Sequence, residues 1–263
     1  MLTRLLERPG WLLGVAATLL AAPFVVPWWE RDFYFDSAVF GGLAQSLLAG
    51  EGYRFQDLPH GKYPPGFPGL LALVQWLGLG VRGVHLVVAA GAVGSVVLTF
   101  RLLRHRHGRW FAFGAAGLTL VNHDFLGHQA HVLSDLPYLA LSLGAILSAE
   151  RMRDDASWRR TLLTAALCVA AASVRSIGVV LAPAILLGLL ARRRGPGEAA
   201  TDRALALRAG VVAAVTLAAV GSWLAYGEHV TRETRVNLLE TVPYHQELVR
   251  KDAVDESRGT LEA

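Results

Sequence analysis

The sequence predicts an all-α integral membrane protein of about seven transmembrane helices, with a long first outer loop carrying two juxtamembrane helices. Of its 263 residues, 53% are hydrophobic and only 17% are charged, and the mean hydropathy is +0.40. Soluble domains usually have about a quarter of their residues charged. Apolar stretches recur along the chain, and the arginines fall between them, which indicates membrane topology rather than a nucleic-acid surface. We therefore expect the protein to contact membrane lipids and not to bind nucleic acid. The predicted spans are 11–28, 83–103, 110–127, 132–149, 161–175, 176–191 and 209–226.

The first span is expected to remain on the chain. Residues 1–27 have a basic start and an apolar core, as a secretory signal peptide does. However, the following segment lacks a small-x-small cleavage site, and Trp28 with Trp29 is typical of an interfacial anchor. An uncleaved span is therefore favoured over a signal peptide.

The apolar stretch 66–79 decides the topology. It has 14 residues, three of them glycines, whereas a straight span needs roughly 20. If it is interfacial and the N-terminus is cytoplasmic, 15 of the 25 Lys and Arg residues fall on the cytoplasmic side. A spanning 66–79 would put the arginine cluster 101–109 outside, against the positive-inside rule. We therefore expect a cytoplasmic N-terminus, an outer C-terminus, a module over 1–226 with the outer loop 29–82, and a polar outer-face tail over 227–263.

Asp36 is a candidate site residue because it precedes an amphipathic helix on the outer side. Phe40, Leu43, Ala44, Leu47 and Leu48 have helical spacing, and Gly50 suits the C-terminal end of such a helix. Asp36 is placed at or near the N-cap. Two roles stay open: a helix cap, or a general base held at the bilayer surface.

Lys62 and Arg175 are candidate phosphate ligands. Lys62, one of two lysines, precedes Tyr63-Pro64-Pro65, whose prolines favour an extended backbone. It could be a snorkelling lysine or a point charge for a phosphate at the outer headgroups. Arg175 interrupts a long apolar stretch, where a charge is costly unless it lies at an interface or a polar cavity. It is either a turn residue or an anion contact.

The segment 123–138 gathers several histidines and acids. Asp124, His128 and His131 could hold a divalent metal if the segment is helical, but their spacing is no specific zinc signature. We therefore predict no metal site and no cofactor, with a divalent metal as the alternative. The favoured interpretation is that Asp135 and Ser134 cap span four, while the histidines line a polar pocket.

Taken together, these parts resemble the N-terminal module of the GT-C glycosyltransferases, and most closely the protein mannosyltransferases, aminoarabinose transferases and Rgt-like sugar transferases. The resemblance covers about residues 10–225. It rests on Asp36 with the helix DSAVFGGLAQSLLAGEGY, the turn KYPPGFPGLLAL, the segment LSDLPYLALSL and the stretch VRSIGVVLAPAILLGLL.

The resemblance implies a multi-pass enzyme of the bacterial inner membrane. It would transfer a sugar from a polyprenyl-phosphate donor to an outer-face lipid, glycan or protein, with inversion. Asp36 would be the catalytic base, and Lys62 would contact the donor phosphate. Arg175, the anion-contact candidate identified above, would help to stabilise the same phosphate. Tyr63, His131 and Asp135 would line the pocket.

Two departures keep a second hypothesis open. Many members have Asp-Glu where this chain has Asp36-Ser37, and relatives usually continue with further spans, so the chain is expected to be a short or partial version. The alternative function is a non-catalytic or transporter-like polytopic membrane protein. A transporter would be favoured by an inverted internal repeat, and none is visible in the sequence.

Overall fold

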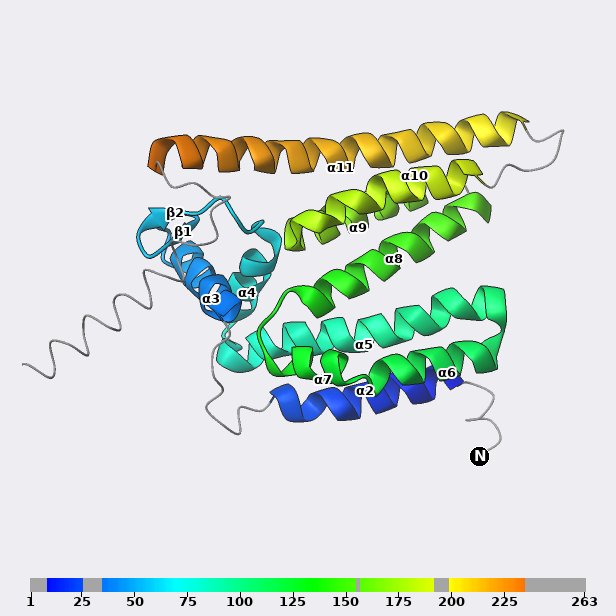
Figure 1. The fold of residues 1–263 in the computed structure, drawn as a ribbon, viewed down its shortest axis with the longest axis horizontal. Helices are drawn as coiled ribbons and strands as arrows, with labels where there is room; N and C mark the ends of the chain where they lie inside the picture. The colour runs from blue at the N-terminus through cyan, green and yellow to red at the C-terminus, as the bar shows by residue number, and fades with distance from the viewer. Residues whose placement is uncertain (1–8, 26–34, 155–156, 192–198, 235–263) are drawn as a thin grey trace, which may run out of the picture.

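The computed structural model describes residues 9–25, 35–154, 157–191 and 199–234, most of which form long helices lying side by side (Figure 1). The helices are α2 (Pro9–Val25), α3 (Phe35–Leu48), α4 (Gly66–Trp76), α5 (Gly80–His107), α6 (Arg109–Leu120), α7 (His123–Ala130), α8 (Asp135–Asp154), α9 (Trp158–Val174), the 3-10 helix η1 (Ser176–Val180), α10 (Leu181–Ala191) and α11 (Ala199–Thr234). One small hairpin joins β1 (Arg54–Phe55) to β2 (Leu58–Pro59). The predicted helical class is confirmed.

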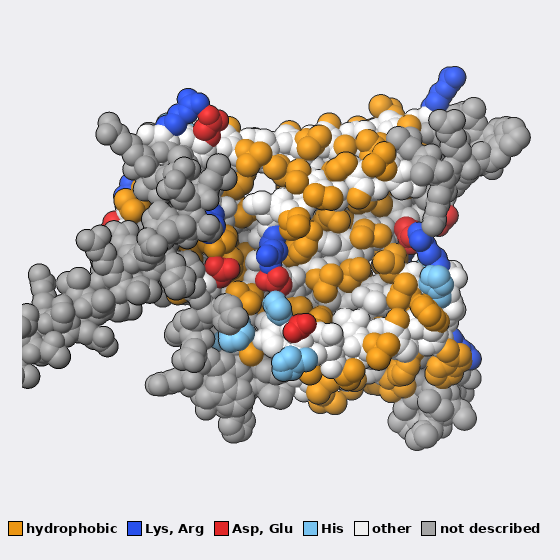
Figure 2. Space-filling model, viewed as in Figure 1, with side chains coloured by type: hydrophobic (Ala, Val, Ile, Leu, Met, Phe, Trp, Pro, Cys, Tyr) orange, Lys and Arg blue, Asp and Glu red, His pale blue; other side chains and the backbone are white. Residues whose placement is uncertain are grey.

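Membrane character is supported by helix length and composition. In the described part of the chain, α5 and the 203–230 stretch of α11 are long and apolar enough to cross a membrane. The pair α7 and α8 would add a third crossing if it is one broken span, because the two helices are bent by 118°. Hydrophobic side chains cover much of the face seen in Figure 2, with charged and histidine side chains gathered toward its left part and its right edge.

Several predicted bounds differ from the observed helices, most clearly in three places. The span 110–127 is interrupted: α6 ends at Leu120, and α7, which contains residues 123–127, follows after Asn122, whose side chain caps α7 by accepting a hydrogen bond from the Phe125 N–H at 3.0 Å. The span 132–149 starts at Asp135 and continues to Asp154. The boundary at 226/227 falls inside α11, which continues to Thr234. The rest of the predicted tail, residues 29–34 of the predicted loop and residues 26–28 of the predicted first span lie outside the described residues.

The segment predicted as the outer loop contains the two predicted helices, α3 and α4, and the hairpin between them, all at one end of the molecule (Figure 1). The hairpin turn places Gln56 at φ 51° and Asp57 at φ 65°, a left-handed conformation uncommon for residues other than glycine. Phe55 packs onto α3 at Gly42, where an added Cβ would lie 2.8 Å from the Phe55 ring. The hairpin is therefore closely packed on the helix that carries Asp36.

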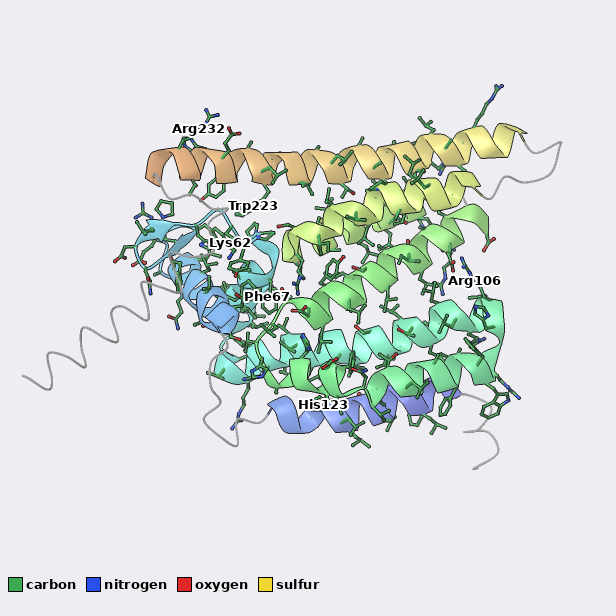
Figure 3. The ribbon with its side chains drawn as sticks, viewed as in Figure 1. Lys62, Phe67, Arg106, His123, Trp223 and Arg232 are labelled. Carbon is green, nitrogen blue, oxygen red and sulfur yellow. The ribbon has the colours of Figure 1, made fainter. Side chains whose placement is uncertain are left out.

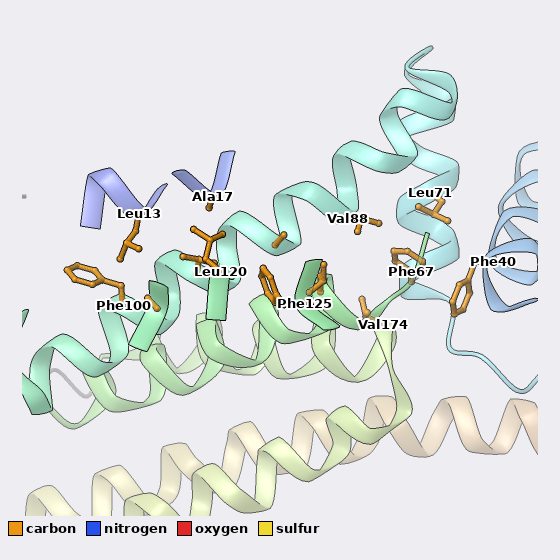
Figure 4. Packing of buried hydrophobic residues seen from close by; sticks show 14 of the residues in the cluster. Leu13, Ala17, Phe40, Phe67, Leu71, Val88, Phe100, Leu120, Phe125 and Val174 are labelled. Carbon is orange, nitrogen blue, oxygen red and sulfur yellow. The ribbon is translucent and has the colours of Figure 1, made fainter. Parts of the chain in front are cut away.

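A continuous apolar core fixes this loop to the helices (Figure 4). Phe40 of α3 meets Phe67 of α4 edge to face at 5.0 Å, and both belong to a buried cluster with Leu71, Val88 and Val174. A second cluster joins α8, α9, α10 and α11. The loop is thus part of the packed structure, and its polar side chains have defined positions.

The start of α4 lies directly against the end of α9. A Cβ added to Gly66 would lie 2.6 Å from the carbonyl oxygen of Ser173, so only glycine permits this approach. Ser173 is two residues before Arg175, and Gly66 is three residues after Tyr63. The packing therefore brings the Lys62–Pro65 segment next to the Arg175 turn.

Candidate functional site

Asp36 and Tyr63 are joined by a short hydrogen bond. Asp36 is partly exposed in the first turn of α3, and its Oδ1 accepts a hydrogen bond from the Tyr63 hydroxyl at 2.6 Å. Because α3 already begins at Phe35, Asp36 is not the residue before the helix. Its carboxylate instead contacts Tyr63, which lies 27 residues further along the chain.

Tyr63 is itself held from several sides. Its ring lies edge to face with Phe40 at 5.0 Å and is stacked on His60 at 5.4 Å, with the two planes 15° apart. Its backbone N–H donates to His60 Nε2 at 3.1 Å. Its carbonyl oxygen accepts from the Tyr53 hydroxyl at 2.8 Å. The phenol that contacts Asp36 is therefore fixed in position before any ligand binds.

The phenol of Tyr63 remains protonated and donates. Burial raises its pKa above the usual range, the hydrogen bond and charge of Asp36 raise it further, and the charge of Arg175 acts in the opposite direction. A neutral phenol cannot take a proton from a substrate. Of the pair, only the Asp36 carboxylate can act as a base.

His60 is buried and neutral. Burial, and next the charge of Lys62, lower its pKa to about 4. Since Nε2 accepts from the Tyr63 N–H, the ring hydrogen lies on Nδ1, which is buried and finds no hydrogen-bond partner among the described residues. This histidine supports Tyr63 and was not expected from the sequence.

Lys62 approaches the same tyrosine. Its half-buried side chain places Nζ 5.1 Å from the centre of the Tyr63 ring, a cation–π contact. Figure 3 shows Lys62 at the loop end of the molecule, the end at which Trp223 also lies. Asp36 thus contacts the hydroxyl of Tyr63, and Lys62 contacts its ring.

Arg175 forms an ion pair with Asp135. Arg175 has an extended backbone between α9 and η1, and its Nη1 contacts Oδ1 of Asp135, the first residue of α8. Each side chain is 38% exposed, and such exposed pairs add only about 0–1 kcal/mol to stability. Asp135 is the first residue of α8 and its Oδ1 contacts Arg175, while its predicted capping of span four with Ser134 stays a prediction. The turn position predicted for Arg175 is confirmed.

The histidine segment contributes no metal centre in the described residues. Asp124 and His128 lie on α7, where the Asp124 carbonyl is 2.6 Å from His128 Nδ1, and His131 ends that helix. Nowhere in the described ranges do three or more His, Cys, Asp or Glu residues come together in a way that could hold a metal ion. His131 lies on the short link to Asp135, and its predicted pocket-lining role stays a prediction.

An apolar cavity of about 300 Å³ adjoins the polar residues. Pro64, which follows Tyr63, and Ser176, which follows Arg175, both line it. Most of its remaining wall comes from α9 and α11, including Trp223 and Tyr226. Trp223 also meets the Tyr53 ring edge to face at 5.7 Å. The site therefore pairs a charged part with an apolar part, as a ligand with a charged head and an apolar chain requires.

Sequence reasoning missed Tyr53, His60 and Trp223. Each is an aromatic side chain whose role depends on contacts between distant segments: Tyr53 and His60 within the loop, Trp223 from the far end of the chain. A usable signal was the concentration of aromatic residues and histidine between 53 and 63, unusual for a solvated loop. Comparison with known proteins gave no match: no protein-family model, no curated protein and no solved structure is detectably similar to this chain.

Proposed function

We propose that this chain is a polytopic membrane glycosyltransferase that moves a sugar from a polyprenyl-phosphate donor to an acceptor on the outer face of the membrane. The observation that carries the proposal is the position of Asp36. Its partly exposed carboxylate is oriented by Tyr63, and Tyr63 lies within electrostatic reach of Lys62 and Arg175. The resemblance of the sequence to the GT-C enzymes points to the same residue.

The proposed topology has seven crossings. The chain would cross in α2, α5, α6, α8, α9, η1 with α10, and α11, with the N-terminus in the cytoplasm and the α3–α4 loop and C-terminus outside. At 1.5 Å per residue, α6 covers only about 18 Å, so α7 would have to complete its crossing of a bilayer core about 30 Å thick. Support comes from the arginine distribution, because the α5–α6 junction carries the cluster 101–109 at the end of the molecule opposite Lys62 (Figure 3).

A lipid-linked donor fits both halves of the site. Its phosphate would lie near the cations of Lys62 and Arg175, with Lys62 as a point charge and Arg175 as a planar donor. The isoprenoid chain would leave through the apolar cavity lined by Pro64 and Trp223. A phosphate already carried by a membrane lipid needs no nucleotide-binding loop.

The reaction would be a single displacement. As an acceptor hydroxyl oxygen attacks the anomeric carbon, Asp36 takes its proton. The bond between the anomeric carbon and the phosphate oxygen breaks, and its electron pair leaves with polyprenyl phosphate, so the configuration inverts. Lys62 and Arg175 would stabilise the negative charge that develops on the leaving phosphate. Tyr63 would position the base without exchanging a proton.

The test is sugar transfer by Asp36→Asn in proteoliposomes, with thermal unfolding measured in parallel. Asparagine can still accept the Tyr63 hydrogen bond but cannot take a proton, so transfer should fall roughly 10²–10⁴-fold while the melting temperature changes little. Glu51→Gln is the matched control, since it removes an exposed acid of the same loop.

Two outcomes would contradict the proposal. If Asp36→Asn transfers sugar as fast as wild type, Asp36 is a structural residue and not the base. If folded wild-type protein transfers none of a panel of polyprenyl-phosphate sugars, the rival hypothesis of a non-catalytic or transporter-like membrane protein is preferred.

A further inference from the structure

A large groove lies at the end of the molecule away from the Asp36 site. It has a volume of about 930 Å³ and lies between α2, α5 and α6. Apolar residues form most of its wall, and Arg101, Arg104 and Arg109 line one part of it. We propose that this groove binds an anionic phospholipid of the cytoplasmic leaflet, with the phosphate at the arginines and an acyl chain along the apolar wall. The inference rests on the proposed membrane placement and is independent of sugar transfer.

Three arginines, Arg101, Arg104 and Arg109, line the same groove. Arg101 and Arg104 are three residues apart on α5 and therefore on the same helix face. Gly108, at φ 81°, lets the chain reverse so that α6 begins with Arg109 beside them. Guanidinium groups suit phosphate because their planar N–H donors can bind two of its oxygens. Three clustered cations repel one another, and an anionic headgroup relieves that repulsion.

Arg106, which lies between Arg104 and Arg109 in the sequence, differs from the groove arginines because its charge is paired. Arg106 forms an ion pair with Glu150 of α8 and is absent from the groove lining. Within the ranges that the structure describes, Arg101, Arg104 and Arg109 have no carboxylate partner. The positive charge at the groove is therefore uncompensated by described acids, whereas the charge just beside it is compensated.

Two glycines of α2 line the apolar wall where α2 packs closely on α5. On α2, Gly10 lies so close to α5 that an added Cβ would be 2.4 Å from the Phe100 ring, and one at Gly14 would be 3.6 Å from Val97. Along the same helix, Trp11 is 62% and Leu19 is 68% exposed. From Gly10 to Leu19 the helix rises about 14 Å, so the apolar wall is long enough to contact an acyl chain along that distance.

The charge of the arginines and the length of the apolar wall together favour one kind of ligand for the groove. A free phosphate would satisfy the arginines but leave the apolar wall beyond them exposed. A zwitterionic lipid would cover the wall but bring a second positive charge to an already cationic rim. An anionic phospholipid satisfies both parts.

The test compares lipid retention by native mass spectrometry and thermal stabilisation, using phosphatidylglycerol and phosphatidylcholine in detergent. Wild type should retain phosphatidylglycerol at least about tenfold better than phosphatidylcholine. The triple variant Arg101→Gln, Arg104→Gln, Arg109→Gln should lose that preference. A control triple, Arg82→Gln, Arg159→Gln, Arg203→Gln, removes the same charge from exposed positions elsewhere and should keep it.

Gly14→Phe tests the apolar wall by filling it, and it should weaken retention of both lipids. If the first triple variant is unfolded, Arg104→Gln against Arg159→Gln supplies the same comparison. Equal preference in the groove and control variants would overturn the proposal. So would stabilisation by millimolar inorganic phosphate as large as that by phosphatidylglycerol, or unchanged lipid retention in Gly14→Phe, because either result would indicate an anion site without an acyl groove.

Discussion

Acidification should destabilise the protein through His60. The folded state lowers the His60 pKa from 6.5 to about 4, so between these values the unfolded chain binds a proton that the folded chain does not. Stability from the neutral histidine is therefore complete above pH 6.5 and is lost as the pH falls through 6.5 toward 4. Protonation would remove the Nε2 acceptor of the Tyr63 N–H and place a charge beside Lys62.

The size of the effect follows from the same two pKa values. Lowering the pH from 7.5 to 5 should cost about 2 kcal/mol, because each unit of pKa difference corresponds to about 1.4 kcal/mol and the titration is incomplete at pH 5. For a chain of this size, that loss corresponds to a decrease of about 4–8 °C in melting temperature.

The assay is thermal unfolding in detergent over this pH range, comparing wild type with His60→Gln. Glutamine can still accept the Tyr63 hydrogen bond but does not titrate, so its melting curve should depend less on pH by the stated amount. His105→Gln is the matched control, since His105 is an exposed histidine at the other end of the molecule. If wild type and His60→Gln lose stability in parallel, His60 does not titrate as argued, and the support it gives Tyr63 is not pH-dependent.

Two further predictions concern the loop. Gly66→Ala should destabilise the protein by about 1–3 kcal/mol because the new Cβ overlaps Ser173. Gly69→Ala is the control, because a Cβ there meets nothing within 4 Å. If thermal unfolding gives both variants the same melting temperature, the α4–α9 contact is looser than described. Lys62→Ala should weaken donor binding, measured as a raised KM for a polyprenyl-phosphate sugar. The melting temperature should stay nearly unchanged, because the contact of Lys62 with Tyr63 is a partly exposed cation–π interaction. An unchanged KM would remove Lys62 from the proposed phosphate site.

Apolar periodicity and turn residues predicted which segments are helical, but not where every helix breaks. The apolar run through 110–127 concealed the end of α6, although Asn122 is a good N-cap residue. The hairpin was missed because its turn is Gln56-Asp57, without the glycine that usually marks such turns. In both places a local backbone interaction overrode the hydrophobic pattern.

The candidate site was predicted as separate residues and not as an arrangement. Asp36, Lys62 and Arg175 could each be selected because a charge next to an apolar segment needs a reason. Tyr63 and Asp135 were also selected, but their pairing with Asp36 and Arg175 could not be predicted, since Tyr63 lies 27 residues from Asp36, and Asp135 lies 40 residues before Arg175. Sequence spacing carries no information about contacts over such separations, which depend on how the helices pack.

Tyr63 explains how an acid and two cations can be close without cancelling one another. If Asp36 were ion-paired directly with Lys62 or Arg175, the cation would be less available to a phosphate and the carboxylate would be less able to accept a proton. Instead, the carboxylate accepts from a neutral phenol, and Lys62 lies on the ring of that phenol. Arg175 pairs with Asp135, an exposed contact weak enough for a phosphate to compete with. The tyrosine that separates Lys62 from the Pro-Pro pair in the sequence is therefore the residue that keeps the proposed base apart from the proposed phosphate ligands in the structure.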